Sequence, residues 1–230
     1  MNVGPEEVKG QPGVIFFDAA GTLIRLSRPV GRIYAQAARD HGVDADEARL
    51  EAAFREVWRS MPHRPPAEVP RENDDRPWWQ IIASETLRRA SQPAANFDAD
   101  AWFTDLYDRF TQPGVWILYE DVLPCLDVVG RHARLAVLSN FDGRLRTILG
   151  NLGVADRFEH LFISSEIGAE KPSEQIFRHA LKAMNTPAGQ CLHVGDDAER
   201  DQEGARAAGL AAFLVDRPAR SLAEIAKLYV

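Results

Sequence analysis

The sequence has little of several features that would indicate particular functions. Only two of its 230 residues are cysteines, Cys125 and Cys191, and they lie in segments that predict a helix and a buried strand. We expect two reduced thiols in the core rather than a disulfide or a metal-binding pair. Basic residues number 27 against 34 acidic ones, so the net charge is -7. This balance argues against a protein that binds nucleic acid or anionic membranes, since such proteins usually carry a basic surface.

Long apolar runs are also missing. No run approaches the length of a membrane span, and residues 1–13 contain no apolar core of a signal peptide. We therefore expect a cytoplasmic protein. With 230 residues, 45% of them hydrophobic, the chain can bury one large domain or a domain with an insert.

Predicted strands alternate with predicted helices along most of the chain. Apolar, β-favouring runs that predict buried strands occur at 14–17, 134–138, 161–163, 191–194 and 210–215. This rhythm predicts an α/β fold with a doubly wound parallel sheet, a Rossmann-like core made of residues 1–27 and 113–230. Residues 28–112 instead carry four helical patterns and are predicted as an inserted all-helical cap, in which the proline-rich stretch 62–77 is a loop.

Several local features of the chain carry specific predictions. In the insert, Asp98 and either Asp44 or Asp46 are placed to cap helices. The insert's tryptophans, Trp78, Trp79 and Trp102, share apolar stripes with Ile and Leu, which favours core packing over an aromatic cage. In the flanking core, Asp121 is predicted to start a helix, and residues 23–26 suggest a small hairpin over the end of the sheet.

Asp18 directly follows the first predicted strand and precedes a Gly-Thr turn. In open α/β sheets, ligands bind outside the carboxyl ends of the strands, so Asp18 lies where such a fold carries out chemistry. A carboxylate that merely caps the following turn is the alternative interpretation.

The first four of the five predicted strands are followed by polar groups, and their number favours the functional interpretation. These groups are, in chain order, Asp18, Ser139, Lys171, and the cluster Asp196, Asp197 and Asp201. Because parallel strand ends converge, we expect a site that binds a divalent metal and a phosphoryl group. The carboxylates of Asp18 and Asp196 would repel each other unless a cation lay between them. Mg²⁺ is the natural choice, since it prefers hard oxygen ligands and leaves room for phosphate and water.

In this order and spacing, the motifs resemble those of the haloacid dehalogenase-like (HAD) superfamily with a helical cap inserted after the first motif. The resemblance covers residues 14–215, and the segments 28–31, 78–79 and 138–142 resemble the branch of HAD-like hydrolase domain-containing proteins, whose substrates are poorly known. It implies a hydrolase, usually a phosphatase, that acts on a small phosphorylated or otherwise anionic substrate.

The resemblance also implies roles for individual residues. Asp18 would attack phosphorus and become a transient aspartyl phosphate, while Ser139 and Lys171 would contact and neutralise the phosphoryl oxygens. The expected Mg²⁺ ligands are Asp18, the backbone carbonyl of Ala20, Asp196, and the supporting acids Asp197 and Asp201. The expected substrate-binding positions are Gly21, Thr22 and Asn140.

Ala20 is where the chain departs from the phosphatases of this family, which carry a second Asp two places after the nucleophile. That Asp protonates the leaving oxygen and later activates water, work typically worth about 10²- to 10⁴-fold in rate. Phosphonatases of the family have Ala at this position but need a cap lysine, and no lysine lies between Lys9 and Lys171. Dehalogenases lack the second Asp and also need no metal. The retained acids, Asp196, Asp197 and Asp201, argue against dehalogenation.

Two main interpretations stay open. One is a slow or specialised Mg²⁺-dependent phosphatase, and the other is a phospho-ligand-binding or regulatory protein without turnover. Asp142 or His193 could replace the missing acid, although a helix-starting Asp and a core histidine are favoured. Three cap arginines could reach an anionic substrate, although helical arginines are usually solvated; they are Arg28, Arg32 and Arg76. Neither the substrate nor the oligomeric state follows from the sequence.

Overall fold

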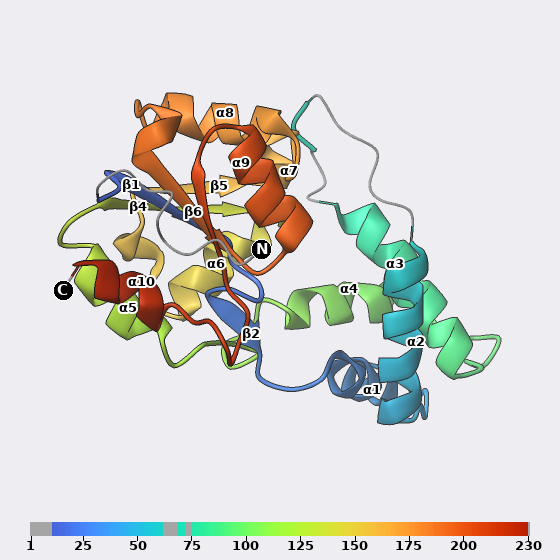
Figure 1. Cartoon of the computed structure of the whole chain (residues 1–230). Coiled ribbons are helices and arrows are strands. Elements are labelled where there is room, and N and C mark those ends of the chain that lie inside the picture. The colour runs from blue at the N-terminus through green and yellow to red at the C-terminus, as the bar shows by residue number, and fades with distance from the viewer. Residues whose placement is uncertain (1–10, 62–68, 72–74, 230) are drawn as a thin grey trace. The chain divides into compact units, whose positions relative to one another are not determined.

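The computed structural model of the chain describes residues 11–61, 69–71 and 75–229. These residues form two compact units, which Figure 1 shows in their chain colours. Of the described residues, 11–25, 69–71 and 118–229 belong to the first unit, and 26–61 and 75–117 belong to the second. The short segment 69–71 therefore groups with the first unit, although it lies within the stretch 28–112 predicted as the insert.

The first unit is built on a five-stranded parallel sheet in the order β5-β4-β1-β6-β7. The strands are β1 (Val14–Phe17), β4 (Arg134–Ser139), β5 (His160–Ile163), β6 (Cys191–Gly195) and β7 (Ala211–Leu214). Strand β1 lies at the centre, between β4 and β6, and all four of its side chains are buried. This arrangement confirms the predicted α/β class, and it explains the unbroken apolar run, because a central parallel strand is covered on both faces.

Helices cover the two faces of this sheet. They are α5 (Val122–Val129), α6 (Arg144–Asn151), α7 (Ser164–Ile167), α8 (Glu174–Ala183), α9 (Gly204–Ala207) and α10 (Ala223–Ala226). Short 3-10 turns span Ala155–Arg157, Ala188–Gln190 and Lys227–Tyr229, and a π-helical turn spans Ala198–Glu203. Figure 1 shows α8 and α9 on one side of the sheet and α5 and α10 on the other. Phe16 of β1 shares a buried cluster with Phe177 of α8, and successive strand residues point to opposite faces, so β1 anchors both layers.

The second unit consists of the helices α1 (Val30–Asp40), α2 (Glu47–Ser60), α3 (Arg76–Ala90) and α4 (Ala99–Arg109). Two predicted caps are confirmed: Asp46 accepts a hydrogen bond from the backbone of Arg49, and Asp98 accepts one from Ala101. Trp102 is fully buried in the core of this unit, as predicted. Trp78 and Trp79 are only partly buried and pack against the rather exposed Trp58, so the core prediction holds for Trp102 and in part for the other two.

The structure corrects one local prediction and confirms another. Residues 23–26 do not form a local hairpin: β2 (Ile24–Leu26) pairs with β3 (Trp116–Leu118), which returns from the far end of the insert. Asp121 stands directly before α5 and so starts this helix as predicted, although its carboxylate makes no capping bond and pairs with Arg217. In both cases a partner distant in the sequence provides the contact. The predicted loop 62–77 lies partly outside the described residues, and α3 already begins at its end.

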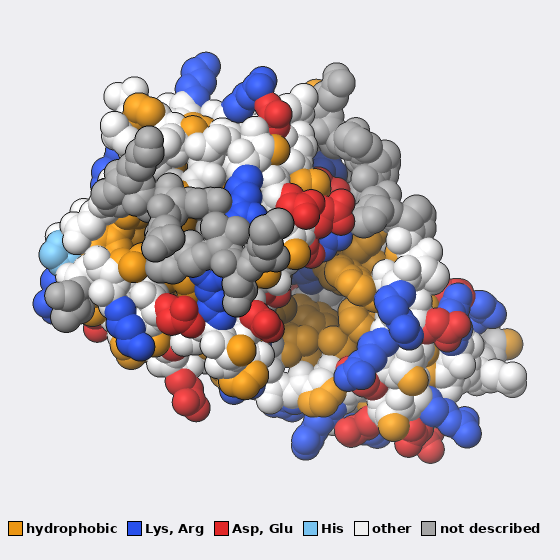
Figure 2. All heavy atoms as spheres, in the orientation of Figure 1, with side chains coloured by type: hydrophobic (Ala, Val, Ile, Leu, Met, Phe, Trp, Pro, Cys, Tyr) orange, Lys and Arg blue, Asp and Glu red, His pale blue; other side chains and the backbone are white. Residues whose placement is uncertain are grey.

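The surface agrees with the mixed composition. On the face that Figure 2 shows, basic and acidic side chains of the described residues are interspersed. No helix in the described part of the chain combines the length and apolar character needed to cross a membrane.

Candidate active site

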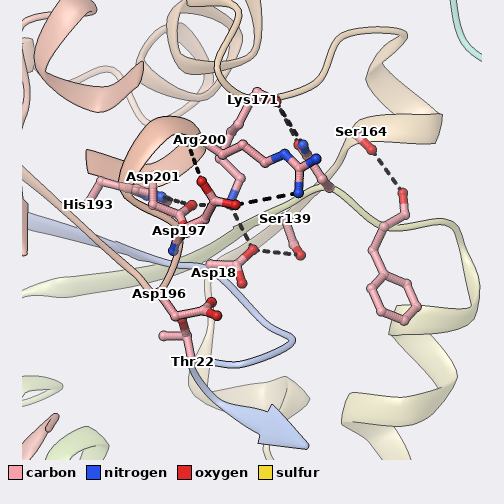
Figure 3. A network of polar contacts seen from close by, with 12 residues as sticks. Asp18, Thr22, Ser139, Ser164, Lys171, His193, Asp196, Asp197, Arg200 and Asp201 are labelled. Carbon is pink, nitrogen blue, oxygen red and sulfur yellow. Dashed lines mark hydrogen bonds and ion pairs between the residues drawn. The ribbon is translucent and has the colours of Figure 1, made fainter. Parts of the chain in front are cut away.

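Three polar side chains meet at the carboxyl end of the central strands. Asp18 follows β1, Ser139 ends β4 and Asp196 follows β6. Because β1 lies between the other two strands, Asp18 is flanked by both residues (Figure 3). Its backbone N–H also donates to the carbonyl of Val194, which extends the strand pairing up to the carboxylate itself. The parallel topology thus gathers residues separated by more than a hundred positions.

Asp18 is buried, with 7% of its surface exposed, and two donors bind one of its oxygens. Oδ1 accepts hydrogen bonds from Oγ of Ser139 at 3.0 Å and from Nζ of Lys171 at 2.7 Å. Burial raises the pKa of Asp18 to about 6, because the lost hydration outweighs the attraction of Lys171 and because Asp201 adds repulsion. Asp18 is therefore a carboxylate whose negative charge needs support from cations.

Lys171 provides one such cation. Its Nζ bridges Oδ1 of Asp18 and Oδ1 of Asp201, the second at 2.5 Å, and the side chain is almost completely buried. Burial alone would lower the pKa of Lys171, but the two carboxylates outweigh it and the pKa is raised. Asn140 holds the backbone of this lysine: its Nδ2 donates to the Lys171 carbonyl at 2.8 Å, and its Oδ1 accepts from the Lys171 N–H at 2.7 Å. Both ends of the amide thus position the lysine loop, and a role of Asn140 in substrate binding stays a prediction.

Asp201 lies on the π-helical turn, a rare form that often occurs at functional sites. Besides Lys171, its Oδ1 contacts Nε2 of His193 at 2.9 Å, and its Oδ2 accepts the backbone N–H of Asp197 at 3.0 Å. Burial would raise the pKa of Asp201, but Lys171 and His193 outweigh burial and lower it. Gly195 leaves the necessary room, since a Cβ there would lie 2.1 Å from Cγ of Asp201.

Asp196 contacts the turn that follows Asp18. Thr22 donates from Oγ1 to Oδ1 of Asp196 at 3.1 Å. Gly21 has a φ of +94°, and a Cβ on it would lie 2.2 Å from Oδ2 of Asp196. Only glycine fits such a turn against the carboxylate. Burial, followed by the nearby Asp201, raises the pKa of Asp196.

Asp18, Asp196 and Asp201 form a group of acids that could hold a metal ion. Each offers one oxygen, and these oxygens all lie within 4.8 Å of one another. Hard carboxylate oxygens at this spacing fit Mg²⁺, and a divalent cation would offset the repulsion among them. The carboxylate of Asp197 lies outside this group: its Oδ1 accepts the N–H groups of Glu199 and Arg200 and caps the π-helical turn.

Comparison with known proteins assigns the chain to a family. The model of the haloacid dehalogenase-like hydrolases matches residues 12–209. The chain belongs to this family. This confirms the family indicated by the sequence motifs.

Curated relatives share most of the chain's length. Haloacid dehalogenase-like hydrolase domain-containing protein 3 of Mus musculus is 36% identical over 210 residues, which cover 89% of this chain and 82% of the relative. The Homo sapiens protein of the same name is 34% identical over 207 residues, with the same coverage of both chains. The match therefore includes the insert as well as the HAD core.

Solved structures share the fold at lower identity. A HAD phosphatase from Thermococcus onnurineus is 20% identical with a TM-score of 0.65, covering 95% of this chain and 97% of that one. The HAD-hydrolase YfnB from Bacillus subtilis, bound to magnesium, is 17% identical with a TM-score of 0.68, covering 96% and 99%. The defluorinating L-2-haloacid dehalogenase Rha0230 is 16% identical with a TM-score of 0.75, covering 97% of both chains. At these identities the comparison concerns the HAD fold alone.

Ala20 occupies the position where HAD phosphatases are expected to carry their second Asp. It is exposed, and its backbone forms a single bridge to Ile24. Asp142, considered as a substitute acid, is buried in a two-point ion pair with Arg144, at 2.9 and 2.7 Å. His193, the other candidate, is buried and contacts Asp201. Asp142 is therefore held in an ion pair, and His193 is a buried histidine that contacts Asp201, so a role of either residue as the substitute acid stays a prediction.

The arginines considered for substrate binding lie in the helical unit. Arg76 donates from Nη2 to Oγ1 of Thr104 at 2.9 Å, and its guanidinium lies 4.8 Å from the ring centre of Tyr107. These contacts engage its guanidinium within the unit, and contact of Arg28, Arg32 or Arg76 with a substrate stays a prediction.

Two contacts at the site were not predicted from sequence. His193 was considered as a substitute acid and as a core histidine, but its contact with Asp201 was not predicted. Arg217 gave no local signal, yet it donates to the carbonyls of Gly21 and Thr22 in the turn after Asp18. Such contacts depend on where the chain returns in space, which no local pattern reports.

Proposed function

We propose that this HAD hydrolase is a Mg²⁺-dependent phosphatase that acts on a small phosphorylated metabolite through an aspartyl phosphate at Asp18. The observation that carries the proposal is the group Asp18, Asp196 and Asp201, whose oxygens lie within 4.8 Å of one another beside Lys171. A cluster with three carboxylates and one lysine favours a divalent cation. A metal-independent dehalogenase would have no need for such a cluster of acids.

The hydrogen bonds of Asp18 suit nucleophilic attack. Ser139 and Lys171 both donate to Oδ1, which leaves the lone pairs of Oδ2 for bonding to phosphorus. As the bond from Oδ2 to phosphorus forms, the bond to the leaving oxygen breaks, and Lys171 and Ser139 stabilise the negative charge on the phosphoryl oxygens. Mg²⁺, held by the three acids and the carbonyl of Ala20, would supply further charge neutralisation. Water then attacks the phosphorus of the aspartyl phosphate, which breaks the bond to Oδ2, releases phosphate and regenerates the carboxylate of Asp18.

Ala20 restricts the leaving group. Its methyl group cannot donate a proton, so the leaving oxygen must depart as an anion that takes its proton from water or from the substrate itself. Substrates with acidic leaving groups, such as aryl or acyl phosphates and phosphoanhydrides, should therefore turn over faster than alkyl phosphates.

A phospho-ligand-binding protein without turnover is the second candidate function, and Ala20 is the observation that favours it. The groups that would bind phosphate and metal are kept, whereas the expected acid is missing. Binding needs only the former.

A phosphoester panel with Mg²⁺ tests the proposal. Phosphate release should occur, depend on Mg²⁺, and disappear in Asp18→Asn. Asp127→Asn serves as the matched control, because this exposed carboxylate pairs with Arg157 on the surface, away from the acidic group. Binding of a phosphorylated compound without any release would favour the second candidate. Halide release from a 2-haloacid in the presence of a chelator would instead favour a dehalogenase.

A further inference from the structure

Two residues from distant parts of the chain contact the Gly21–Thr22 turn. Asp196 accepts the bond from Thr22 (Figure 3), and its carboxylate lies close to Gly21. Arg217, from the segment after β7, binds the carbonyls of the same turn. Nη1 of Arg217 donates to the carbonyl of Gly21 and Nη2 donates to the carbonyl of Thr22, each at 2.9 Å.

The guanidinium of Arg217 is itself fixed in place. Nη2 pairs with both oxygens of Asp121, at 2.9 and 3.1 Å, and the group lies 3.9 Å from the ring centre of Tyr119. Asp121 in turn accepts the backbone N–H of Leu222 at 2.8 Å. Both members of the ion pair are largely shielded from water. A planar fork that binds two adjacent carbonyls, an aromatic face and a carboxylate has contacts that a lysine cannot reproduce.

The turn that Arg217 holds begins next to Ala20, whose carbonyl is an expected metal ligand. We propose that Arg217 is a positioning residue for the metal site: it fixes the Gly21–Thr22 turn against Asp196 and so orients the Ala20 carbonyl toward the cation. The inference rests on the proposed Mg²⁺ site. It follows the general behaviour of metal centres, in which groups that orient the ligands change metal affinity by about 10- to 100-fold.

Mg²⁺ affinity measured by isothermal titration calorimetry tests this inference, on the full chain and well below the melting temperature of each variant. Arg217→Met should weaken Mg²⁺ binding by about tenfold or more. Arg217→Lys should recover only part of the loss, since a single ammonium cannot hold both carbonyls and Asp121. A role confined to stability would lower the melting temperature and leave the Mg²⁺ affinity unchanged.

Arg220→Met is the matched control. Arg220 lies in the same segment and its guanidinium is 4.0 Å from the ring centre of Phe213, yet its contacts are with β7 and Glu224 rather than with the turn. This variant should keep wild-type Mg²⁺ affinity. If Arg217→Met does not fold, Asp121→Asn replaces it, because losing the carboxylate that orients Arg217 should weaken Mg²⁺ binding in the same direction.

Asp196→Asn separates failure of this inference from failure of the proposed function. If Asp196→Asn loses Mg²⁺ binding while Arg217→Met and Asp121→Asn keep wild-type affinity, the role of Arg217 is wrong and the metal site stands. If the wild-type protein itself binds no Mg²⁺, the proposed metal site is wrong and the inference is overturned with it.

Discussion

The ammonium group of Lys171 lies 2.7 Å from Oδ1 of Asp18, and both side chains are buried. Since Lys171 also binds Asp201, its single positive charge is shared by two of the three acids in the cluster. The remaining excess of negative charge is what a divalent cation would offset. The stability of this unit and its affinity for Mg²⁺ are therefore linked.

Replacing Lys171 tests that link. Lys171→Met should destabilise the metal-free protein by about 3–5 kcal/mol, because it leaves buried carboxylates without their partner. Added Mg²⁺ should restore part of the loss, which urea unfolding with and without Mg²⁺ would measure. Lys182→Met, at an exposed position of α8, should change neither the free energy of unfolding nor its response to Mg²⁺. A Lys171→Met protein that keeps wild-type stability, and whose stability does not change with Mg²⁺, would contradict the expected charge balance.

Ala20→Asp should raise the rate on an aryl phosphate by at least about tenfold, because it supplies the missing proton donor. The gain should be larger still on an alkyl phosphate, whose leaving group depends more on protonation. Steady-state phosphate release measures both. Equal rates in the two proteins would indicate a further defect in the pocket or a different reaction.

Gly21→Ala should damage the metal site as well as the turn. The φ of +94° costs an alanine about 1–2 kcal/mol, and the new Cβ would also push against the carboxylate of Asp196. Gly153→Ala is the control, since Gly153 has a φ of +69° and nothing within 4 Å of the added Cβ. Both variants should lose thermal stability, whereas only Gly21→Ala should weaken Mg²⁺ binding in a calorimetric titration.

The tryptophans of the helical unit should differ in energetic weight. Trp102 has no exposed surface and packs against Tyr34 and Phe97, so Trp102→Ala should cost about 3–5 kcal/mol. Trp58 is 44% exposed and mainly stacks on other rings, so Trp58→Ala should cost only about 1 kcal/mol. Urea unfolding followed by circular dichroism measures both. Similar losses would contradict the burial argument.

The protein should lose stability at alkaline pH. Burial raises the pKa of Cys125 to about 12 and that of Cys191 to about 11, from an ordinary value of 9.0. The unfolded chain therefore releases these protons near pH 9 while the folded chain keeps them, so the free energy of unfolding falls as pH rises above 9. Melting temperatures at about pH 8 and about pH 10.5 should show this decrease. The decrease should be smaller in Cys125→Ala. An equal decrease would show that the Cys125 thiol does not cause the loss of stability.

Much of the fold was predictable because its signals are local. The strand β1 is a run of apolar β-formers, and helices α2 and α4 begin where Asp46 and Asp98 cap them. The pairing of β2 with β3 was not predictable, since the two strands stand at opposite ends of the insert. Periodicity reports which face of an element is buried and says little about its partner.

The sequence by itself determined the class of fold, the family, and the order in which Asp18, Ser139, Lys171 and the final acids follow their strands. It could do so because strand ends in a parallel sheet converge whatever the details of packing. Only the tertiary structure decided that Asn140 holds the Lys171 loop, that Asp197 caps a helix outside the group of three acids, and that Arg217 binds Gly21 from 196 positions away. Those contacts depend on the directions of side chains and on where the chain returns, and both are set when the core packs.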